Sequence, residues 1–388
     1  MKRNAIIILI GFILIGSSCT IPLTQQQDSR RPLSIAFQSQ TDEPLHIIGN
    51  IELSQMSSGG VGTRSDPYLL AGLNLVSAGT CIVIENTTAF FAIQGCYLEN
   101  TMRLEPVVLL NNVENGLIQD CYIRGGSIGA SLVLSVDSIV KDSVLFDSYN
   151  GIEIFESENC TILDCKTFSN RLGISVEYSN GSIVTNSSIY NNQDGLQIGV
   201  YSDSTRIYGN KIGWNLFNAN NNGNNTEFTN GIDTGNAWSD YDGSGGYEVG
   251  GFYHITDTFA TILADFEDPM IDSPIDKVFD IDSTGETLTW VVSDEFPYLY
   301  LLYIDDIPQD IEIWDGREIT VSLDALPEGT HSLVMTVQDG AGNVENDEVM
   351  VTAVSFMLGG IGTELVIWSS ALTVVILVLI VLLIKKMP

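Results

Sequence analysis

A glycine recurs every 22 residues through the middle of this chain. A fixed period of this length is the signature of a solenoid, in which each repeat forms one coil and successive coils stack on each other. The repeat therefore limits the fold before any motif is considered. The four glycines are Gly129, Gly151, Gly173 and Gly195.

Within each copy, apolar residues alternate with other residues, as in Gly-Ile-Glu-Ile at 151–154 and Gly-Ile-Ser-Val at 173–176. A period of two predicts β-strands, and so short a repeat leaves no room for a helix beside several strands. Asn, Asp, Ser and Gly fill the gaps, and these residues favour turns. We therefore expect an all-β fold of roughly seven to nine coils, stacked by parallel strand pairing.

Stacking places equivalent residues of successive coils in rows. One row holds small or polar side chains that are expected to line an interior corner, and its cysteines are expected to be reduced thiols. The neighbouring row should point outward, because side chains alternate between the two faces of a strand. The inner row comprises Cys96, Cys121, Ser143, Cys165, Ser187 and Asn210, and the outer row Gly95, Asp120, Asp142, Asp164, Asn186 and Gly209.

Three carboxylates of the outer row lie at one-coil spacing, at Asp120, Asp142 and Asp164. One hypothesis is a weak calcium site, because Ca²⁺ takes oxygen ligands. The alternative, which we favour, is a solvated acidic edge with Lys141 nearby. Calcium is thus the one cofactor that these residues leave open, and the three aspartates are its candidate ligands.

The coils resemble the parallel β-helix repeats of the NosD-like and pectate-lyase-like superfamily. Gly-Thr-Arg-Ser-Asp-Pro-Tyr-Leu-Leu at 62–70 is similar to that family's opening segment, and Gly-Asn-Ala-Trp-Ser-Asp-Tyr at 235–241 to its closing segment. The resemblance covers about residues 45–255 and implies a right-handed parallel β-helix. It implies no single activity, because one fold hosts lyases, hydrolases, binding modules and copper-assembly factors.

A second domain is predicted at 264–355, where the 22-residue period disappears. About seven short strand-like segments, separated by turn signals, predict a small β-sandwich. The pattern Leu326-x-x-Gly329-x-His331, followed by Asp339-x-x-Gly342-Asn343, resembles immunoglobulin-like modules of prokaryotic cell-surface proteins. This domain contains no cysteine and is expected to act as a spacer.

The two ends of the chain carry export and anchoring signals. A basic start, a short apolar run and small residues predict a signal peptide, although Cys19 leaves a lipoprotein anchor open. Near the other end, twenty residues without a charge are long enough to cross a bilayer, and the following lysines are expected in the cytoplasm. We therefore expect a single-pass protein of the cell membrane with its body outside the cell. The expected segments are a signal peptide (1–19), a flexible leader (20–44), the β-helix (45–255), the sandwich (264–355), a linker (356–364), a transmembrane helix (365–384) and a cytoplasmic tail (385–388), which includes Lys385 and Lys386.

The chain is strongly acidic, with 49 acidic and 16 basic residues and a formal net charge of −33. Such a surface argues against nucleic acid or anionic lipid headgroups as partners. An exported chain also presents its Asn-x-Ser/Thr sequons to any glycosylation machinery of the host. The candidate glycosylation sites are Asn86, Asn159, Asn180, Asn186 and Asn224.

The residues favour a non-catalytic recognition or structural module, with carbohydrate or other cell-envelope components as partners. Tyrosines on a long flat face offer rings for sugar stacking; the alternative is that they are ordinary surface or corner residues. No residue is assigned a catalytic role. The candidate binding residues are Tyr178, Tyr190, Tyr201 and Tyr208.

Two other functions remain as alternatives. An extracellular polysaccharide lyase or glycoside hydrolase would need a base or paired carboxylates, yet the candidate bases are scattered and acidic residues are everywhere. A NosD-like copper-assembly factor would need soft or imidazole ligands, and the histidines are far apart in the sequence. The candidate bases are Arg124, Lys141, Lys166 and Arg171, and the histidines are His46, His254 and His331.

Overall fold

The structure, a computed structural model, describes residues 43–355, which all fall within one compact unit. The predicted signal peptide, Cys19, almost all of the leader, the linker, the transmembrane helix and the cytoplasmic tail lie outside the described residues. Between residues 43 and 355, no helix has both the length and the apolar character needed to span a membrane.

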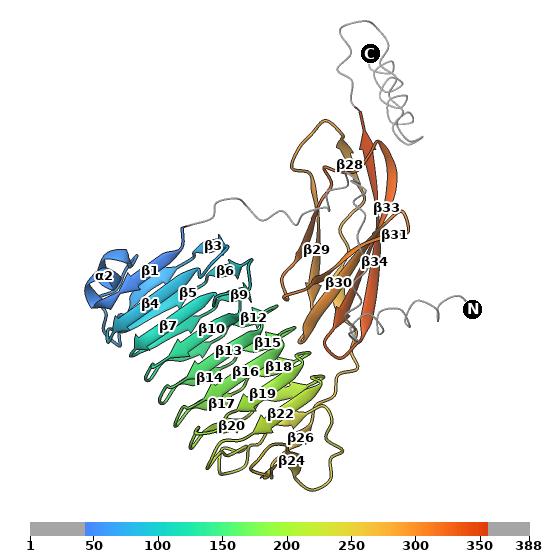
Figure 1. The fold of residues 1–388 in the computed structure, drawn as a ribbon. Coiled ribbons are helices and arrows are strands. Elements are labelled where there is room, and N and C mark those ends of the chain that lie inside the picture. Colours follow the sequence, from blue (N-terminus) through green and yellow to red (C-terminus); the bar gives the residue numbers. More distant parts are fainter. Residues whose placement is uncertain (1–42, 356–388) are drawn as a thin grey trace, which may run out of the picture. The chain divides into compact units, whose positions relative to one another are not determined.

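Three parallel sheets form the coils, and successive coils add one strand to each sheet (Figure 1). The first sheet comprises β1 (Leu45–Ile48), β4 (Ile82–Thr87), β7 (Val108–Val113), β10 (Ile128–Val133), β13 (Asn150–Phe155), β16 (Leu172–Glu177), β19 (Asp194–Ile198) and β22 (Phe217–Asn221). The second sheet comprises β2 (Tyr68–Ala71), β5 (Phe91–Gln94), β8 (Gly116–Gln119), β11 (Ile139–Lys141), β14 (Thr161–Leu163), β17 (Ile183–Thr185) and β20 (Arg206–Tyr208). The third sheet comprises β3 (Asn74–Ser77), β6 (Tyr97–Asn100), β9 (Tyr122–Gly125), β12 (Val144–Phe146), β15 (Lys166–Phe168), β18 (Ser188–Tyr190), β21 (Lys211–Gly213), β23 (Ala237–Trp238) and β26 (Thr261–Ile262).

The strand register confirms the predicted solenoid. Ile152 pairs with Ile174, and Ile174 pairs with Leu196, so equivalent residues of three coils lie over one another. All three side chains are buried in one continuous core. The eight strands of the first sheet agree with the expected number of coils.

The recurring glycines occupy positions where two coils approach too closely for a side chain. A Cβ atom built on Gly151 would lie 2.6 Å from the carbonyl oxygen of Gly173, and one built on Gly173 would lie 2.6 Å from that of Gly195. Real Cβ atoms do not come so close to a backbone oxygen. The 22-residue recurrence of glycine is therefore a steric requirement of the four coils that contain Gly129, Gly151, Gly173 and Gly195.

Each of the three corners of a coil is lined by buried polar side chains that bond to the preceding coil. The predicted inner row lies between the second and third sheets, and its members are buried as expected. There, the Cys165 backbone N–H donates to Ser187 Oγ at 3.1 Å. At the second corner, Ser157 N–H donates to Ser179 Oγ at 3.0 Å, and at the third, Ser148 N–H donates to Asn170 Oδ1 at 2.9 Å. These bonds satisfy backbone donors that the corners would otherwise leave unpaired. The five cysteines of the described range, Cys81, Cys96, Cys121, Cys160 and Cys165, are buried free thiols.

Both ends of the stack are covered. Helix α2 (Gly49–Met56) lies at the first coil and buries Leu53 in the core. At the last coils, β24 (Tyr247–Val249) and β25 (Ile255–Asp257) form an antiparallel pair. The ring of Trp238 is buried there and stacks on Tyr247 with 4.0 Å between the ring centroids. Covering both ends keeps the terminal strands from presenting unpaired edges.

The C-terminal part of the described chain forms two further sheets, and the strands expected there are present. Side chains from both sheets are buried, among them Trp290 and Leu333. The three-stranded sheet comprises β27 (Met270–Asp272), β29 (Thr287–Ser293) and β32 (Ile319–Ser322). The five-stranded sheet comprises β28 (Lys277–Asp280), β34 (Val344–Val354), β33 (Gly329–Asp339), β30 (Pro297–Ile304) and β31 (Ile307–Ile313).

A column of aromatic rings joins the third sheet of the β-helix to these C-terminal strands. Phe146, Phe168 and Tyr190 stack with centroid separations of 5.4 Å and 5.1 Å. Phe296 packs edge-on against Tyr190 at 5.4 Å, and the Tyr190 hydroxyl donates to the Pro297 carbonyl at 2.8 Å. The outer face of the third sheet is therefore partly buried by residues that follow the solenoid in the sequence.

Beside this column, Asp265, Asp294 and Asp339 bring one carboxylate oxygen each within 4.8 Å of the others. Asp339 accepts hydrogen bonds from the backbone N–H groups of Gly342 and Asn343, at 2.7 Å and 2.8 Å, which explains the Asp-x-x-Gly-Asn motif as a turn closure. Burial, together with the charges of Asp339 and Asp265, raises the pKa of Asp294 to about 6.

Substitution of Gly173 by Ala should lower the free energy of unfolding by roughly 1–3 kcal/mol, because the new methyl group forces two coils apart. Urea denaturation measures the change. Gly250→Ala is the matched control, since a Cβ there would meet its nearest neighbour, the Ala219 carbonyl oxygen, at an ordinary 3.6 Å. Equal losses in the two variants would contradict the steric explanation.

Asp294→Asn should stabilise the protein near neutral pH and have little effect in acid. The folded state holds the Asp294 proton more tightly than the unfolded state, whose pKa is near the ordinary 3.8, so wild-type stability from this group falls as the pH rises through about 6. Thermal unfolding midpoints at about pH 4.5 and about pH 7.5 measure the difference between variant and wild type. Asp268→Asn, an exposed control, should show no such pH-dependent gain.

Candidate functional site

The outer row of aspartates has a conformational explanation. Asp120, Asp142 and Asp164 are exposed, as predicted, and their φ angles are 54°, 48° and 52°. Asn186 follows in the same conformation, and Gly95 and Gly209 also have positive φ. Asp, Asn and Gly tolerate this left-handed backbone better than other residues, so the corner itself selects them.

These aspartates do not gather into a metal site. Asp120 accepts a hydrogen bond from Gln119 Nε2 at 2.9 Å, and Asp142 lies 3.7 Å from Lys141 Nζ. In the range 43–355, the only cluster of potential metal ligands is Asp265, Asp294 and Asp339, which belongs to the C-terminal junction. Within residues 43–355, Asp120, Asp142 and Asp164 are therefore not part of a carboxylate cluster, and the calcium hypothesis stays a prediction.

Tyr178 and Tyr201 form an exposed aromatic stack at the corner between the first and second sheets. Their ring centroids lie 5.5 Å apart with an interplanar angle of 24°, and Phe155 contacts Tyr178 edge-on at 5.5 Å. The side of the stack is open to solvent, because Tyr201 is 77% exposed and Tyr178 is 44% exposed. We call Phe155, Tyr178 and Tyr201 the aromatic corner.

The backbone at the aromatic corner is unusual for tyrosine. Tyr178 and Tyr201 have φ angles of 52° and 62°. The same corner position holds Asn112, Leu134 and Glu156 in earlier coils, with φ angles of 53°, 50° and 49°, so the corner imposes this conformation on whatever residue it holds. A bulky residue there costs roughly 1–2 kcal/mol, and these exposed rings recover little by burial. The left-handed backbone is thus a property of the corner, and it is the exposed ring stack that distinguishes the two tyrosines from the residues of earlier coils.

The structure separates the other two candidate tyrosines from this corner. Tyr190 is fully buried in the aromatic column, and burial raises the pKa of its hydroxyl well above the ordinary value. It belongs to the interior and is not accessible to a ligand. Tyr208 is half-buried on the outer face of the second sheet, where it pairs in register with Thr185. Only two of the four predicted tyrosines therefore come together.

Polar side chains line the outer face of the first sheet beside the aromatic corner. Glu153 accepts hydrogen bonds from Ser131 Oγ at 3.3 Å and from Asn150 Nδ2 at 3.2 Å. Burial, and to a lesser degree the charge of Glu177, raise the pKa of the Glu153 carboxyl. Glu177 in turn accepts a hydrogen bond from Gln197 Nε2 at 3.1 Å. This face offers the hydrogen-bonding groups that a hydroxyl-rich ligand needs.

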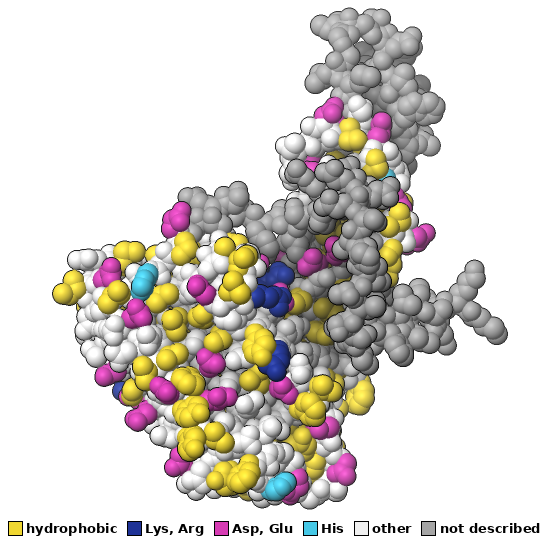
Figure 2. All heavy atoms as spheres, in the orientation of Figure 1, with side chains coloured by type: hydrophobic (Ala, Val, Ile, Leu, Met, Phe, Trp, Pro, Cys, Tyr) yellow, Lys and Arg dark blue, Asp and Glu magenta, His cyan; other side chains and the backbone are white. Residues whose placement is uncertain are grey.

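The space-filling view shows acidic side chains scattered over this side of the molecule, with few lysines and arginines among them (Figure 2). Two of the predicted bases, Lys166 and Arg124, point from the third sheet toward the C-terminal strands. Lys166 Nζ donates to the Glu295 carbonyl at 2.7 Å. Arg171 lies over the exposed ring of Tyr149, 4.4 Å from its centroid. The bases therefore do not converge on the carboxylates of the first sheet.

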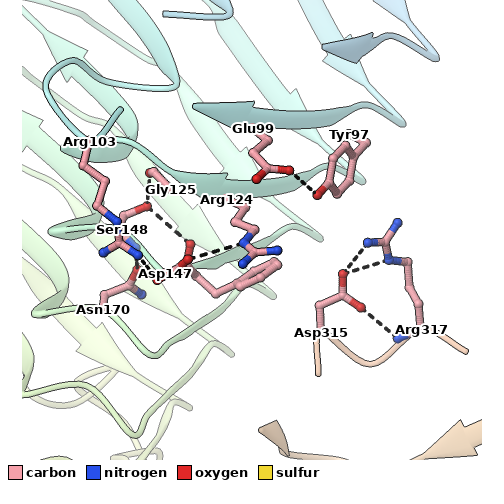
Figure 3. A network of polar contacts seen from close by, with 11 residues as sticks. Tyr97, Glu99, Arg103, Arg124, Gly125, Asp147, Ser148, Asn170, Asp315 and Arg317 are labelled. Atoms are coloured by element: carbon pink, nitrogen blue, oxygen red, sulfur yellow. Dashed lines mark hydrogen bonds and ion pairs between the residues drawn. The ribbon is translucent and has the colours of Figure 1, made fainter. Parts of the chain in front are cut away.

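A network of charged residues that the sequence did not reveal surrounds Arg124 (Figure 3). Arg124 Nε donates to Asp147 at 3.3 Å, and Arg103 also pairs with Asp147. From the C-terminal strands, the Arg317 guanidinium pairs with Asp315 and lies 4.7 Å from the centroid of the Tyr122 ring. One signal for this contact was available, namely the aromatic residues Phe146, Phe168 and Tyr190 at 22-residue spacing on an outward row.

The histidines form no soft-ligand site within residues 43–355. His46 pairs with Glu85 at 3.0 Å, and His331 Nδ1 lies 2.7 Å from an Asp305 carboxylate oxygen. Neither histidine is part of a potential metal-binding cluster in the described chain. The asparagines of the five predicted sequons are all exposed, which is the accessibility that glycosylation requires; they are Asn86, Asn159, Asn180, Asn186 and Asn224.

Two solved structures illustrate the distant similarities of this chain. An alginate lyase from Paenibacillus shares 9% identity over 50% of this chain and 76% of its own, with a TM-score of 0.28. A tailspike protein from a bacteriophage of Escherichia coli O157:H7 shares 10% identity over 73% of this chain and 55% of its own, with a TM-score of 0.31. At these values neither likeness carries an argument about function.

No curated protein matches the sequence. One family does match, the right-handed β-helix region, over residues 60–212 and 106–253. The matched residues together make up half of the chain and coincide with most of the stacked coils. The chain therefore belongs to the right-handed β-helix family.

Proposed function

We propose that this protein is a non-catalytic carbohydrate-binding module in which the aromatic corner and the first sheet hold a glycan. The observation that carries the proposal is the exposed stack of Tyr178 on Tyr201. Aromatic rings offer large, rigid contact area with little loss of conformational entropy. A sugar ring stacked on them places its hydroxyl groups beside the polar face that contains Glu177 and Gln197.

We propose that residues 1–19 direct export, that residues 365–384 anchor the chain, and that the body lies outside the cell. The strongly acidic composition supports this, because a charge of −33 keeps an exposed body soluble. The two C-terminal sheets then act as an immunoglobulin-like spacer between the coils and the membrane.

One observation favours a second candidate, a glycoside hydrolase. Glu153 has a raised pKa and lies under the electrostatic influence of Glu177, and a general acid beside a second carboxylate is the arrangement that glycoside hydrolysis uses. Glu153 is, however, held by two hydrogen bonds, from Ser131 and Asn150, which also suit a purely structural carboxylate. We place this candidate second.

Tyr178→Ala and Tyr201→Ala should each weaken binding to the glycan recognised by the full-length protein by roughly tenfold, because the ring provides the stacking surface. A glycan array identifies the glycan, and titration calorimetry measures the affinity. Tyr208→Ala is the matched control, since it removes a tyrosine from another sheet, and it should leave the affinity unchanged. Absence of binding to any glycan would refute the proposal.

The hydrolase candidate is tested on the same panel by an assay for new reducing ends. If it holds, wild-type protein releases them and Glu153→Gln lowers the rate by at least about a hundredfold, since the variant lacks the transferable proton. The non-catalytic proposal expects no release from wild type or variant. Unchanged glycan affinity of Glu153→Gln would show that the substitution leaves the binding face intact.

A further inference from the structure

A pocket of about 220 Å³ lies between the third sheet of the β-helix and the turn that joins β31 to β32. Its walls include Arg124 and Phe146 from the coils, and Tyr300, Ile313 and Ile319 from the C-terminal strands. Pockets for drug-sized ligands hold roughly 300–1,000 Å³, so this one suits a smaller molecule. It is separate from the aromatic corner, which lies between the first and second sheets.

Arg124 has donor capacity that the protein does not use. A guanidinium carries five N–H donors, and the Nε of Arg124 donates to Asp147 at 3.3 Å. The Nη groups make no hydrogen bond to any residue of the described chain, and the side chain lines the pocket. The guanidinium is held in place from one side by Asp147 and from another by the ring of Phe146, 5.9 Å away. A fixed fork of this kind is suited to a carboxylate.

Tyr300 provides a second unused donor. The residue is only 6% exposed, and its hydroxyl makes no hydrogen bond to any residue from 43 to 355; the hydroxyl oxygen is reached by solvent through the pocket that it lines. Tyr300, Arg124 and Asp315 all line the same pocket. A ligand that accepts a hydrogen bond from this hydroxyl would replace a water molecule there.

The charges around the pocket restrict the ligand further. Asp147 and Asp315 lie beside the two arginines of the network, and Glu318 is also part of the wall. A ligand with two negative charges would meet stronger repulsion from these carboxylates than a ligand with one. The Arg124 Nη groups and the Tyr300 hydroxyl can therefore donate to a ligand that accepts hydrogen bonds. The acidic surroundings favour a ligand with a single negative charge.

We propose that this pocket binds a small carboxylate, whose oxygens accept hydrogen bonds from the Nη groups of Arg124 and from the Tyr300 hydroxyl. The apolar walls formed by Phe146, Ile313 and Ile319 then contact the body of the ligand. The carboxylate has two possible sources, an acidic sugar or a small organic acid. The site does not depend on glycan binding at the aromatic corner.

Titration calorimetry of the full-length protein tests the proposal with four probes: glucuronate, acetate, glucose and inorganic phosphate. Binding of glucuronate or acetate, with glucose bound at least about tenfold more weakly, supports the site, because a charge-assisted hydrogen bond contributes about that much. Preference for glucuronate identifies an acidic sugar, and equal affinity identifies carboxylates in general. Absence of binding by both carboxylates, or tighter binding of phosphate, overturns the proposal.

Tyr300→Phe locates the site with little risk to folding, because the hydroxyl has no partner in the described chain to lose. It should weaken carboxylate binding about tenfold while leaving the thermal unfolding midpoint unchanged or slightly higher. Arg124→Gln should abolish detectable binding. Tyr298→Phe, two residues away on the same strand and outside the pocket wall, is the control and should bind as wild type does. Equal affinity in wild type and Tyr300→Phe would place the carboxylate elsewhere and overturn the assignment.

Discussion

The close approach of successive coils at the recurring glycines is the constraint on which the rest of the molecule depends. With no side chain at Gly151 or Gly173, the first sheet brings its strands into parallel register, and the same register then holds in the other two sheets. Every row of side chains, buried or exposed, follows from that alignment. Candidate functional residues on the coils therefore occur as rows of equivalent positions, one residue from each coil.

Two such rows form different surfaces, one exposed to solvent and one covered by C-terminal residues. At the corner between the first and second sheets, Tyr178 and Tyr201 occupy a left-handed position that holds asparagine, leucine or glutamate in earlier coils, and they form an exposed stack. On the third sheet, an aromatic row is covered by Phe296, and the covering strands bring Tyr300 next to Arg124. The first surface needs the solenoid alone, whereas the second exists only because the C-terminal strands pack on it.

Periodicity in the sequence predicted the coils, the inner row from Cys96 to Asn210 and the positions of the C-terminal strands, because alternation and turn residues are local signals. It did not distinguish Tyr190 from Tyr178, since both face outward from a coil and only tertiary packing buries one of them. The aspartate row was open to a metal interpretation because a sequence does not display backbone conformation. Arg124 and Tyr300 could not be associated, because no sequence pattern spans the two kinds of sheet.

The corner hydrogen bonds run in one direction. In each corner row the backbone N–H of one coil donates to a side chain of the coil that follows it in the sequence, as from Ser157 to Ser179. In the inner row, the series ends at Asp257, whose carboxylate accepts bonds from the Asn236 N–H at 2.7 Å and from Trp238 Nε1 at 3.0 Å. Within the described chain, the inner corner of the last coils thus relies on a charged acceptor, whereas the earlier coils rely on neutral Ser and Asn side chains. Asp257 therefore closes the inner corner of the solenoid chemically as well as sterically.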